Sequence, residues 1–133
     1  MRFLFIFILS IFWATSFAQQ QVVDSLLEIV RQNRGDAQSF AAYKKLGETF
    51  EKQEPTKAII YYRNALKFPF HTAYANDFVG LCNLLAELYH LQGQYDSSVL
   101  LHRKALSLAK KISLESEIAK AYQGIGLNYL STS

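Results

Sequence analysis

Three segments of the chain repeat one pattern at almost equal spacing. The pattern is an aromatic residue, replaced by Cys in the second copy, then an aliphatic residue followed directly by a small one, and then another aromatic residue. Its three copies are Tyr43-x2-Leu46-Gly47-x2-Phe50, Cys82-x2-Leu85-Ala86-x2-Tyr89 and Tyr122-x2-Ile125-Gly126-x2-Tyr129. Self-similarity at a fixed interval is typical of repeat architectures, in which each unit buries its apolar face only against its neighbours. The pattern therefore predicts a stack of like units that holds another protein rather than an enzyme.

Apolar side chains recur at helical spacing both within these copies and in the segments that join them. No long run of alternating apolar and polar residues predicts a strand. Gly35, Pro55, Pro69 and Gly93 mark the breaks, and Ser113 is positioned to cap a last helix. We predict helices over 22–32, 37–52, 55–67, 72–91 and 95–111, and one that begins near 113. The expected fold class is all-α, an antiparallel helix-pair solenoid that winds as a right-handed superhelix.

The first eighteen residues differ from the rest. Arg2 precedes an apolar stretch over 3–13, and Ser16 and Ala18 put small residues at the two positions that a signal peptidase recognises. We predict a signal peptide over 1–18 that is cleaved after Ala18, and a periplasmic or secreted mature chain with no membrane insertion. The alternative is an uncleaved membrane anchor. Residues 19–21 are expected to form a flexible new N-terminus.

The mature chain is expected to hold an N-terminal helix over 19–35 and a repeat array over 36–133. The array resembles the tetratricopeptide repeat, a helix–turn–helix unit, because Ala58-x3-Tyr62 with Ala65, and Ser98-x3-His102 with Ala105, follow the first two copies. The units are 37–70, 72–111 and a half repeat over 113–133. Their interval of 39 or 40 residues exceeds the usual 34. The extra length falls over 66–78 and 106–118, where we expect elongated helices.

The resemblance implies that the small residues at 47, 86 and 126 meet a neighbouring helix closely. It also implies that Ile118, Tyr122, Ile125 and Tyr129 face their own array. The third unit has no second helix in this sequence. Three explanations are open: the chain is a fragment of a longer protein, the last helix caps the array, or two chains self-associate through it.

Charge and composition exclude several classes of function. The net charge is only +3, and the basic residues are dispersed, so no nucleic-acid partner is predicted. His71, His90 and His102 lack a metal-ligand spacing, and Cys82 has no neighbouring base that would make it a nucleophile. We predict neither catalytic residues nor a cofactor or metal.

The resemblance implies a groove, lined by the first helix of each pair, that takes a partner peptide or helix. Six polar positions are the candidates for lining it: Lys44, Glu48, Asn83, Glu87, Lys120 and Gln123. The predicted function is an exported protein–protein interaction scaffold. The alternative is the extracytoplasmic input region of a sensor histidine kinase or a LuxR-type regulator, since repeats of this length resemble those of bacterial sensor and regulator proteins.

Overall fold

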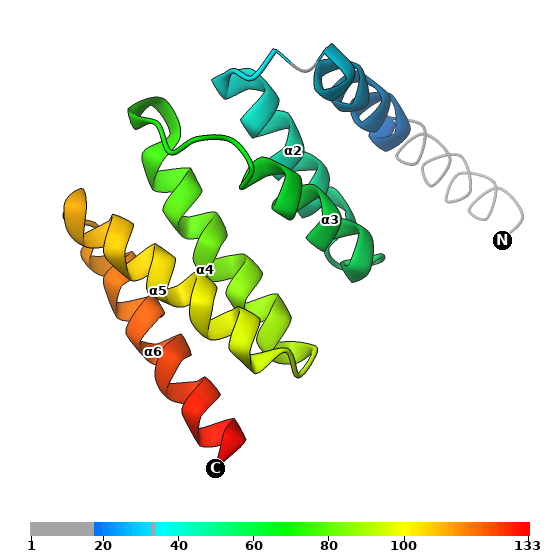
Figure 1. Cartoon of the computed structure of the whole chain (residues 1–133). Coiled ribbons are helices and arrows are strands. Elements are labelled where there is room, and N and C mark those ends of the chain that lie inside the picture. Colours follow the sequence, from blue (N-terminus) through cyan, green and yellow to red (C-terminus); the bar gives the residue numbers. More distant parts are fainter. Residues whose placement is uncertain (1–17, 33) are drawn as a thin grey trace, which may run out of the picture.

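The computed structural model describes residues 18–32 and 34–133, and no strand occurs in these ranges (Figure 1). A helix covers 18–32, and five further α-helices and one 3₁₀ turn follow. They are α2 (Ala37–Phe50), α3 (Pro55–Ala65), η1 (Thr72–Tyr74), α4 (Ala75–Leu91), α5 (Tyr95–Lys111) and α6 (Glu115–Thr132). The predicted all-α solenoid is confirmed. Most of the predicted signal peptide lies outside the described residues.

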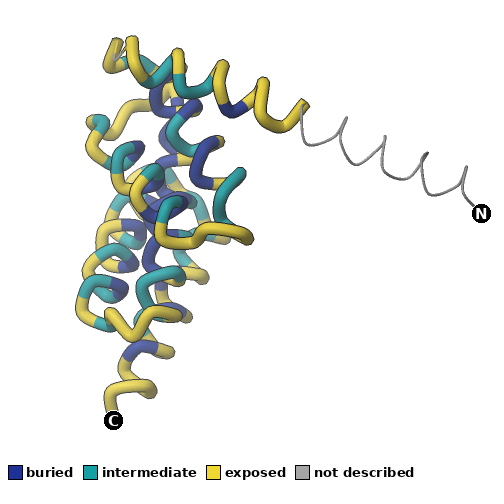
Figure 2. The backbone as a smooth tube through the Cα atoms, turned by 90° about the vertical axis from the view of Figure 1, so that its right-hand side faces the viewer, coloured by how far each residue is buried: buried dark blue, intermediate teal, exposed yellow. Residues whose placement is uncertain are grey.

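Consecutive helices pack side by side as antiparallel neighbours (Figure 1). The most extensive contacts join α2 to α3, α4 to α5 and α5 to α6, and α4 also touches α6. The first helix lies beside α2, and the first helix and α6 lie at opposite ends of the stack. Buried residues follow the inner sides of the helices, whereas the last turns of α6 are mostly exposed (Figure 2).

Several helix boundaries follow from local chemistry that the sequence shows. The side chain of Asp36 caps α2 by accepting a hydrogen bond from the backbone N–H of Ser39 at 2.8 Å. Gly35 and Gly93 adopt φ angles of 70° and 73°, which glycine reaches without steric cost. Pro55 begins α3, where its missing N–H leaves no helical hydrogen bond unmade.

Two local predictions were wrong. Residues 19–21 are helical and continue into the first helix, so they do not form a flexible start. Ser113 does not cap α6: it takes a left-handed φ of 56°, and Leu114 occupies the cap position without a side-chain hydrogen bond. The physical reason is the short reversal between α5 and α6, which uses Ser113 to turn the chain while Leu114 packs against the core.

The prediction of elongated helices holds at only one of its two places. Between the second and third units, α5 extends to Lys111 and only a short turn precedes α6. Between the first and second units, the extra residues form a loop and η1 instead. Pro69 disfavours helix in the residue before it, and its carbonyl accepts a hydrogen bond from the Tyr74 hydroxyl at 2.7 Å.

Aromatic rings fill the junction between the first pair, α2–α3, and the second pair, α4–α5. The ring of Phe40 on α2 stacks on Tyr74 at 4.3 Å between centroids and lies 6.1 Å from the ring of Phe78 on α4. Phe68 meets Phe40 edge-on at 6.5 Å. Such pairs contribute ~0.5–1.5 kcal/mol each beyond the area they bury. Phe68 and Tyr74, which lie between α3 and α4 in the chain, therefore fill the space between the two helix pairs.

The small residue of the motif has different surroundings in each of the three copies. Gly47 lies so close to the ring of Tyr62, on the next helix, that any side chain would overlap that ring. Ala86 is fully buried. Gly126 was predicted to meet a helix, but it is exposed and nothing lies within 4 Å of the Cβ that a substitution would add.

The third copy of the motif accordingly faces outwards. Tyr122 and Tyr129, predicted to face the array, are each 53% exposed. The face of α6 that packs on α4 and α5 carries Ala121, Gly124 and Asn128 instead. The reason is that Gly47 faces the helix that follows it, and among the described residues no helix follows α6 to cover Gly126.

Two glycines of α6 provide a matched test of this packing. We expect Gly126→Ala to raise the free energy of unfolding by ~0.5–1 kcal/mol, because it removes backbone freedom from the unfolded chain at an open helical site. Gly124→Ala should lower it by ~1–3 kcal/mol, because its Cβ would overlap the buried ring of His102. Urea denaturation of both variants checks the opposite signs. Equal effects would contradict the observed packing of α6.

Candidate binding surface

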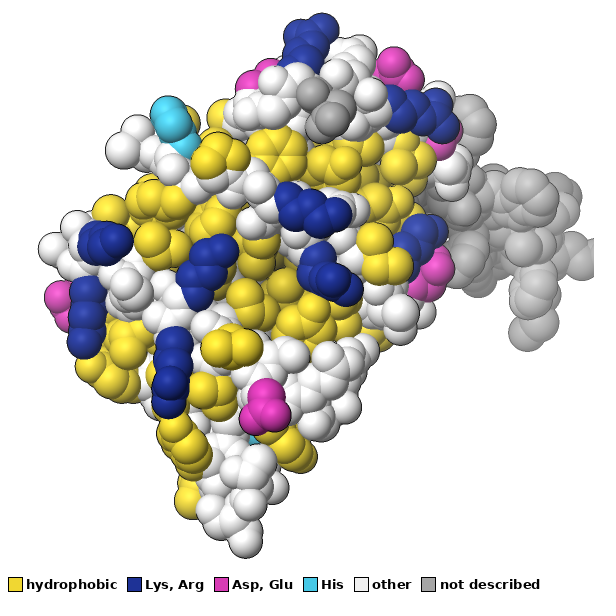
Figure 3. Space-filling model, in the orientation of Figure 1, with side chains coloured by type: hydrophobic (Ala, Val, Ile, Leu, Met, Phe, Trp, Pro, Cys, Tyr) yellow, Lys and Arg dark blue, Asp and Glu magenta, His cyan; other side chains and the backbone are white. Residues whose placement is uncertain are grey.

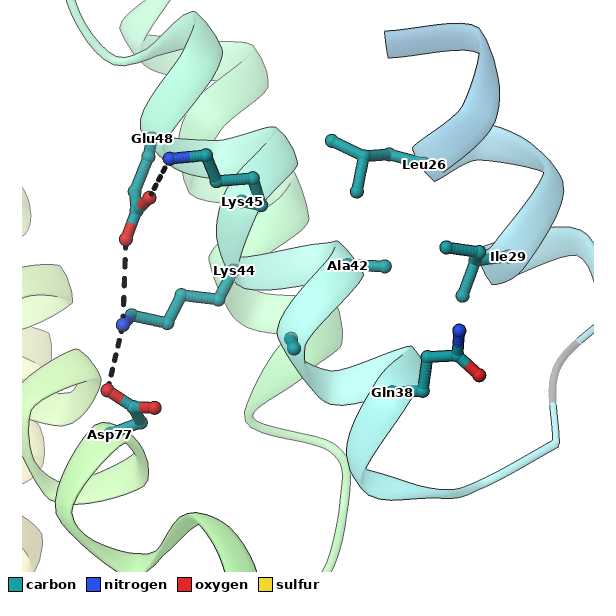
Figure 4. Close-up of a pocket in the computed structure, with 9 residues that line it drawn as sticks. Leu26, Ile29, Gln38, Ala42, Lys44, Lys45, Glu48 and Asp77 are labelled. Carbon is teal, nitrogen blue, oxygen red and sulfur yellow. Dashed lines mark hydrogen bonds and ion pairs between the residues drawn. The ribbon is translucent and has the colours of Figure 1, made fainter. Parts of the chain in front are cut away.

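A pocket of about 400 Å³ lies between the first helix and α2 (Figure 4). Leu26 and Ile29 point into it from the first helix, and Ala41 and Ala42 form its wall on α2. Polar and charged side chains complete the lining: Gln38, Lys44, Lys45, Glu48 and Asp77. The surface thus combines a small apolar recess with charges of both signs, a combination suited to a side chain of a bound segment.

Lys44 connects α2 to α4 at the edge of this pocket. Its Nζ lies 2.8 Å from an oxygen of Asp77 and 3.6 Å from Glu48 (Figure 4). Partial burial works against the charged amine, but the hydrogen bond and negative charge of Asp77 outweigh it and raise the pKa of Lys44. Asp77 and Lys45 remain largely exposed, so both are accessible to a partner.

The structure separates the six positions predicted to line the groove. Lys44 and Glu48 lie together at the pocket. Glu87 on α4 is exposed without a hydrogen-bonding partner among the described residues, and partial burial with the nearby carboxylates of Glu117 and Glu51 raises its pKa. Lys120 pairs with Glu117 at 2.8 Å. Gln123 is exposed on α6.

Asn83 lies in the interior and does not line an open surface. It is 1% exposed, and its side-chain nitrogen donates to the carbonyl and the carboxylate of Glu117, both at 3.0 Å. Its oxygen therefore accepts, and Nδ1 of His102, 2.9 Å away, must carry a proton. One asparagine of α4 thus ties α5 and α6 together.

A second buried amide repeats this arrangement further along α6. The nitrogen of Asn128 donates to the hydroxyl of Ser98 and to the carbonyl of Gly124, both at 2.8 Å. Its oxygen lies 3.0 Å from Nδ1 of His90 on α4. The two amides satisfy polar groups inside the stack of α4, α5 and α6, where an unpaired group would cost ~1–3 kcal/mol.

Sequence reasoning missed seven of the nine residues that line the pocket: Leu26, Ile29, Gln38, Ala41, Ala42, Lys45 and Asp77. Leu26 shows the helical spacing of a core residue, and nothing in the sequence separates it from the others of its helix. Ile29 and Asp77 were not singled out at all. The repeat pattern places the lining positions on α2 and α4, but it does not show that the helix preceding the array closes one side of the pocket.

We next consider metal binding, thiol reactivity and membrane spanning for the described residues. No three His, Cys, Asp or Glu side chains gather there as a metal ion would require. Burial raises the pKa of the Cys82 thiol to about 11, so it stays protonated and unreactive at neutral pH. None of the described helices combines the length and apolarity needed to span a bilayer.

Stacked antiparallel helix pairs define an α-helical repeat protein. Residues 81–115, which span most of α4 and all of α5, match the family model of the tetratricopeptide repeat. This match confirms the family assignment that the repeated motif predicts. The repeat is a non-catalytic unit of protein–protein interaction. No curated protein and no solved structure matches the chain.

The buried His102 makes stability depend on pH. Burial, and secondarily the proximity of His90, hold the pKa of His102 below its ordinary 6.5. The unfolded chain therefore binds a proton at a higher pH than the folded chain does. The contribution of His102 is fully present above pH ~6.5 and is lost as the pH falls towards its folded pKa.

We expect the thermal midpoint to decrease as the pH is lowered from ~7 to ~5.5, because His102 takes up a proton on unfolding in this range. His102→Gln can still donate to Asn83 but does not titrate, so it should flatten this dependence. His71→Asn, at an exposed histidine, is the matched control and should leave the dependence unchanged. Calorimetry across this range is the measurement, and a slope that His102→Gln does not alter would contradict the assignment.

Proposed function

We propose that the pocket between the first helix and α2 binds a segment of a partner protein, either an extended peptide or one face of a helix. The single observation that carries this proposal is the apolar recess beside the charged edge formed by Lys44, Glu48 and Asp77. An apolar side chain of the partner enters the recess. The exposed charges of Lys45 and Asp77 then set its orientation.

The chemistry of the pocket supports a protein ligand over a small molecule. Its walls are short alanine and branched aliphatic side chains, and it is open along the surface between two helices. Lys44 is already neutralised by two carboxylates, so the pocket has no strong net charge that would select an anion. Affinity would come from burying apolar surface, and the charges would supply specificity.

Filling the recess tests the proposal. A displayed random-peptide library selected on the full chain provides the probe, and titration calorimetry measures the selected peptides. Ala41 is exposed and lines the recess, so Ala41→Trp should fill it without disturbing the core. We expect at least a tenfold loss of affinity, about 1.4 kcal/mol.

The matched control is Thr56→Trp, which adds the same ring at an exposed position of α3 that does not line the pocket. It should bind the selected peptides as the unmodified chain does. If peptides bind Ala41→Trp with unchanged affinity, the binding site lies elsewhere and the proposal fails.

We also propose that the chain is exported and functions in the periplasm or outside the cell. The support is the basic, apolar and small-residue order of residues 1–18. Cleavage after Ala18 would leave a helix that begins at the new N-terminus, because residues 18–32 are helical.

Mass spectrometry of the chain produced in a secreting bacterium should therefore find Gln19 as the first residue. Ala18→Leu places a large side chain where the peptidase requires a small one, so this variant should keep its leader. A control that introduces the same residue, Val22→Leu, lies beyond the predicted cleavage point and should be processed normally. Recovery of an unmodified chain that retains Met1 would contradict cleavage.

A further inference from the structure

The first helix begins at the cleavage point proposed above, and this places Gln19 in its first turn. Residues 18–32 are helical, and Gln19 is exposed. Once residues 1–18 are removed, Gln19 carries both a free α-amine and a side-chain amide. The amine and the carbon of that amide are separated by the number of atoms that closes a five-membered ring. An N-terminal glutamine can therefore acylate its own amine.

The side chain of Gln19 is free to react, whereas that of its neighbour Gln20 is engaged. Nε2 of Gln20 donates a hydrogen bond to a carboxylate oxygen of Asp24 at 2.9 Å. The amide of Gln19 has no hydrogen-bonding partner among the described residues. Ring closure at Gln19 therefore breaks no side-chain contact of the described chain.

The helix does not oppose ring closure either. The first four backbone N–H groups of an α-helix have no intrahelical partner, so the nitrogen of Gln19 loses no helical hydrogen bond when it is acylated. The product is a five-membered ring that contains the backbone nitrogen and Cα. Proline, whose ring contains the same two atoms, is favoured at the first position of a helix. The lactam is thus compatible with a helix that begins at residue 19.

A free α-ammonium at Gln19 would be poorly compensated. It would lie at the positive end of the helix dipole, where a cation is unfavourable. Gln19 lines a pocket of about 410 Å³ beside the turn between α2 and α3, and the one carboxylate in that lining, Glu54, is paired with Lys57 at 3.6 Å. The whole chain has a net charge of +3, and Lys and Arg side chains predominate over Asp and Glu on the face shown in Figure 3. Loss of the ammonium charge therefore favours the helical end.

We propose that Gln19 is a modification site and that the mature chain begins with pyroglutamate. The α-amine attacks the side-chain carbonyl carbon, a C–N bond forms, and the amide nitrogen leaves as ammonia with the proton that the amine gives up. This intramolecular acyl transfer needs no oxidant, reductant or co-reactant. The inference rests on the proposed cleavage after Ala18.

The modification would protect the binding pocket beside α2. An exopeptidase that requires a free α-amine cannot remove a residue whose amine is part of a lactam. Shortening of the first helix from its end would otherwise proceed towards Leu26 and Ile29, which line that pocket.

Intact-mass spectrometry of the chain isolated from a secreting bacterium is the test, because glutamine at the start of a digested peptide can cyclise during handling. The mature chain should be lighter, by one molecule of ammonia, than a chain that begins with unmodified Gln19. It should also resist Edman degradation until a pyroglutamyl peptidase removes the first residue. The sequence read after that treatment should begin at Gln20.

Two variants locate the modification. Gln19→Glu keeps the size of the side chain, but an amine does not readily displace oxygen from a carboxylate. This variant should therefore keep its full mass and its free amine, and a broad-specificity aminopeptidase should shorten it. Gln20→Glu makes the same change one residue further on and is the matched control. It should lose ammonia and resist the aminopeptidase as the unmodified sequence does.

The other outcomes separate this inference from the proposed cleavage. A chain that begins at Gln19 with its full mass and a free amine would overturn the modification and leave the cleavage intact. A chain that retains Met1, or that begins at a different residue, would overturn both. Loss of ammonia that persists in Gln19→Glu would place the modified residue elsewhere, and equal resistance of the two variants to the aminopeptidase would contradict the protective role.

Discussion

The spacing of this helical stack depends on rings that lie against glycines of neighbouring helices. Tyr62 covers Gly47 within the first pair, and His102 covers Gly124 between α5 and α6. Because protein interiors are close-packed, a methyl group added at either glycine must push a buried ring aside. His102 is further fixed by its hydrogen bond to Asn83. The polar contacts between α4, α5 and α6 can therefore form only while the close approach of His102 to Gly124 is kept.

The repeated motif was sufficient to predict the fold class, since a period near 40 residues with helical spacing admits few architectures. It was not sufficient to predict which way each copy faces. Gly126 satisfies the pattern as well as Gly47 does, yet the helix that would cover it is not among the described residues. A motif records which contacts a residue can make, whereas burial depends on whether the partner element is present.

The candidate site shows a similar limit. Lys44 and Glu48 could be chosen from their place on α2, one helical step from the core. Asn83 shares that spacing on α4, but α6 packs over it. Its side chain is therefore buried, and it forms hydrogen bonds with α5 and α6. Spacing along one helix cannot reveal which of its faces a later helix will cover. The same holds for Leu26 and Ile29, whose role depends on how the first helix docks against α2.

The junction between the first and second pairs differs in kind from the rest of the stack. Within α4, α5 and α6, helices meet along their length and share buried amide hydrogen bonds. The first pair is held instead by stacked rings from a loop and by the Lys44–Asp77 ion pair, and its helices pack less extensively on α4. Because few helix–helix contacts cross this junction, we expect relative movement of the helix pairs to be concentrated there.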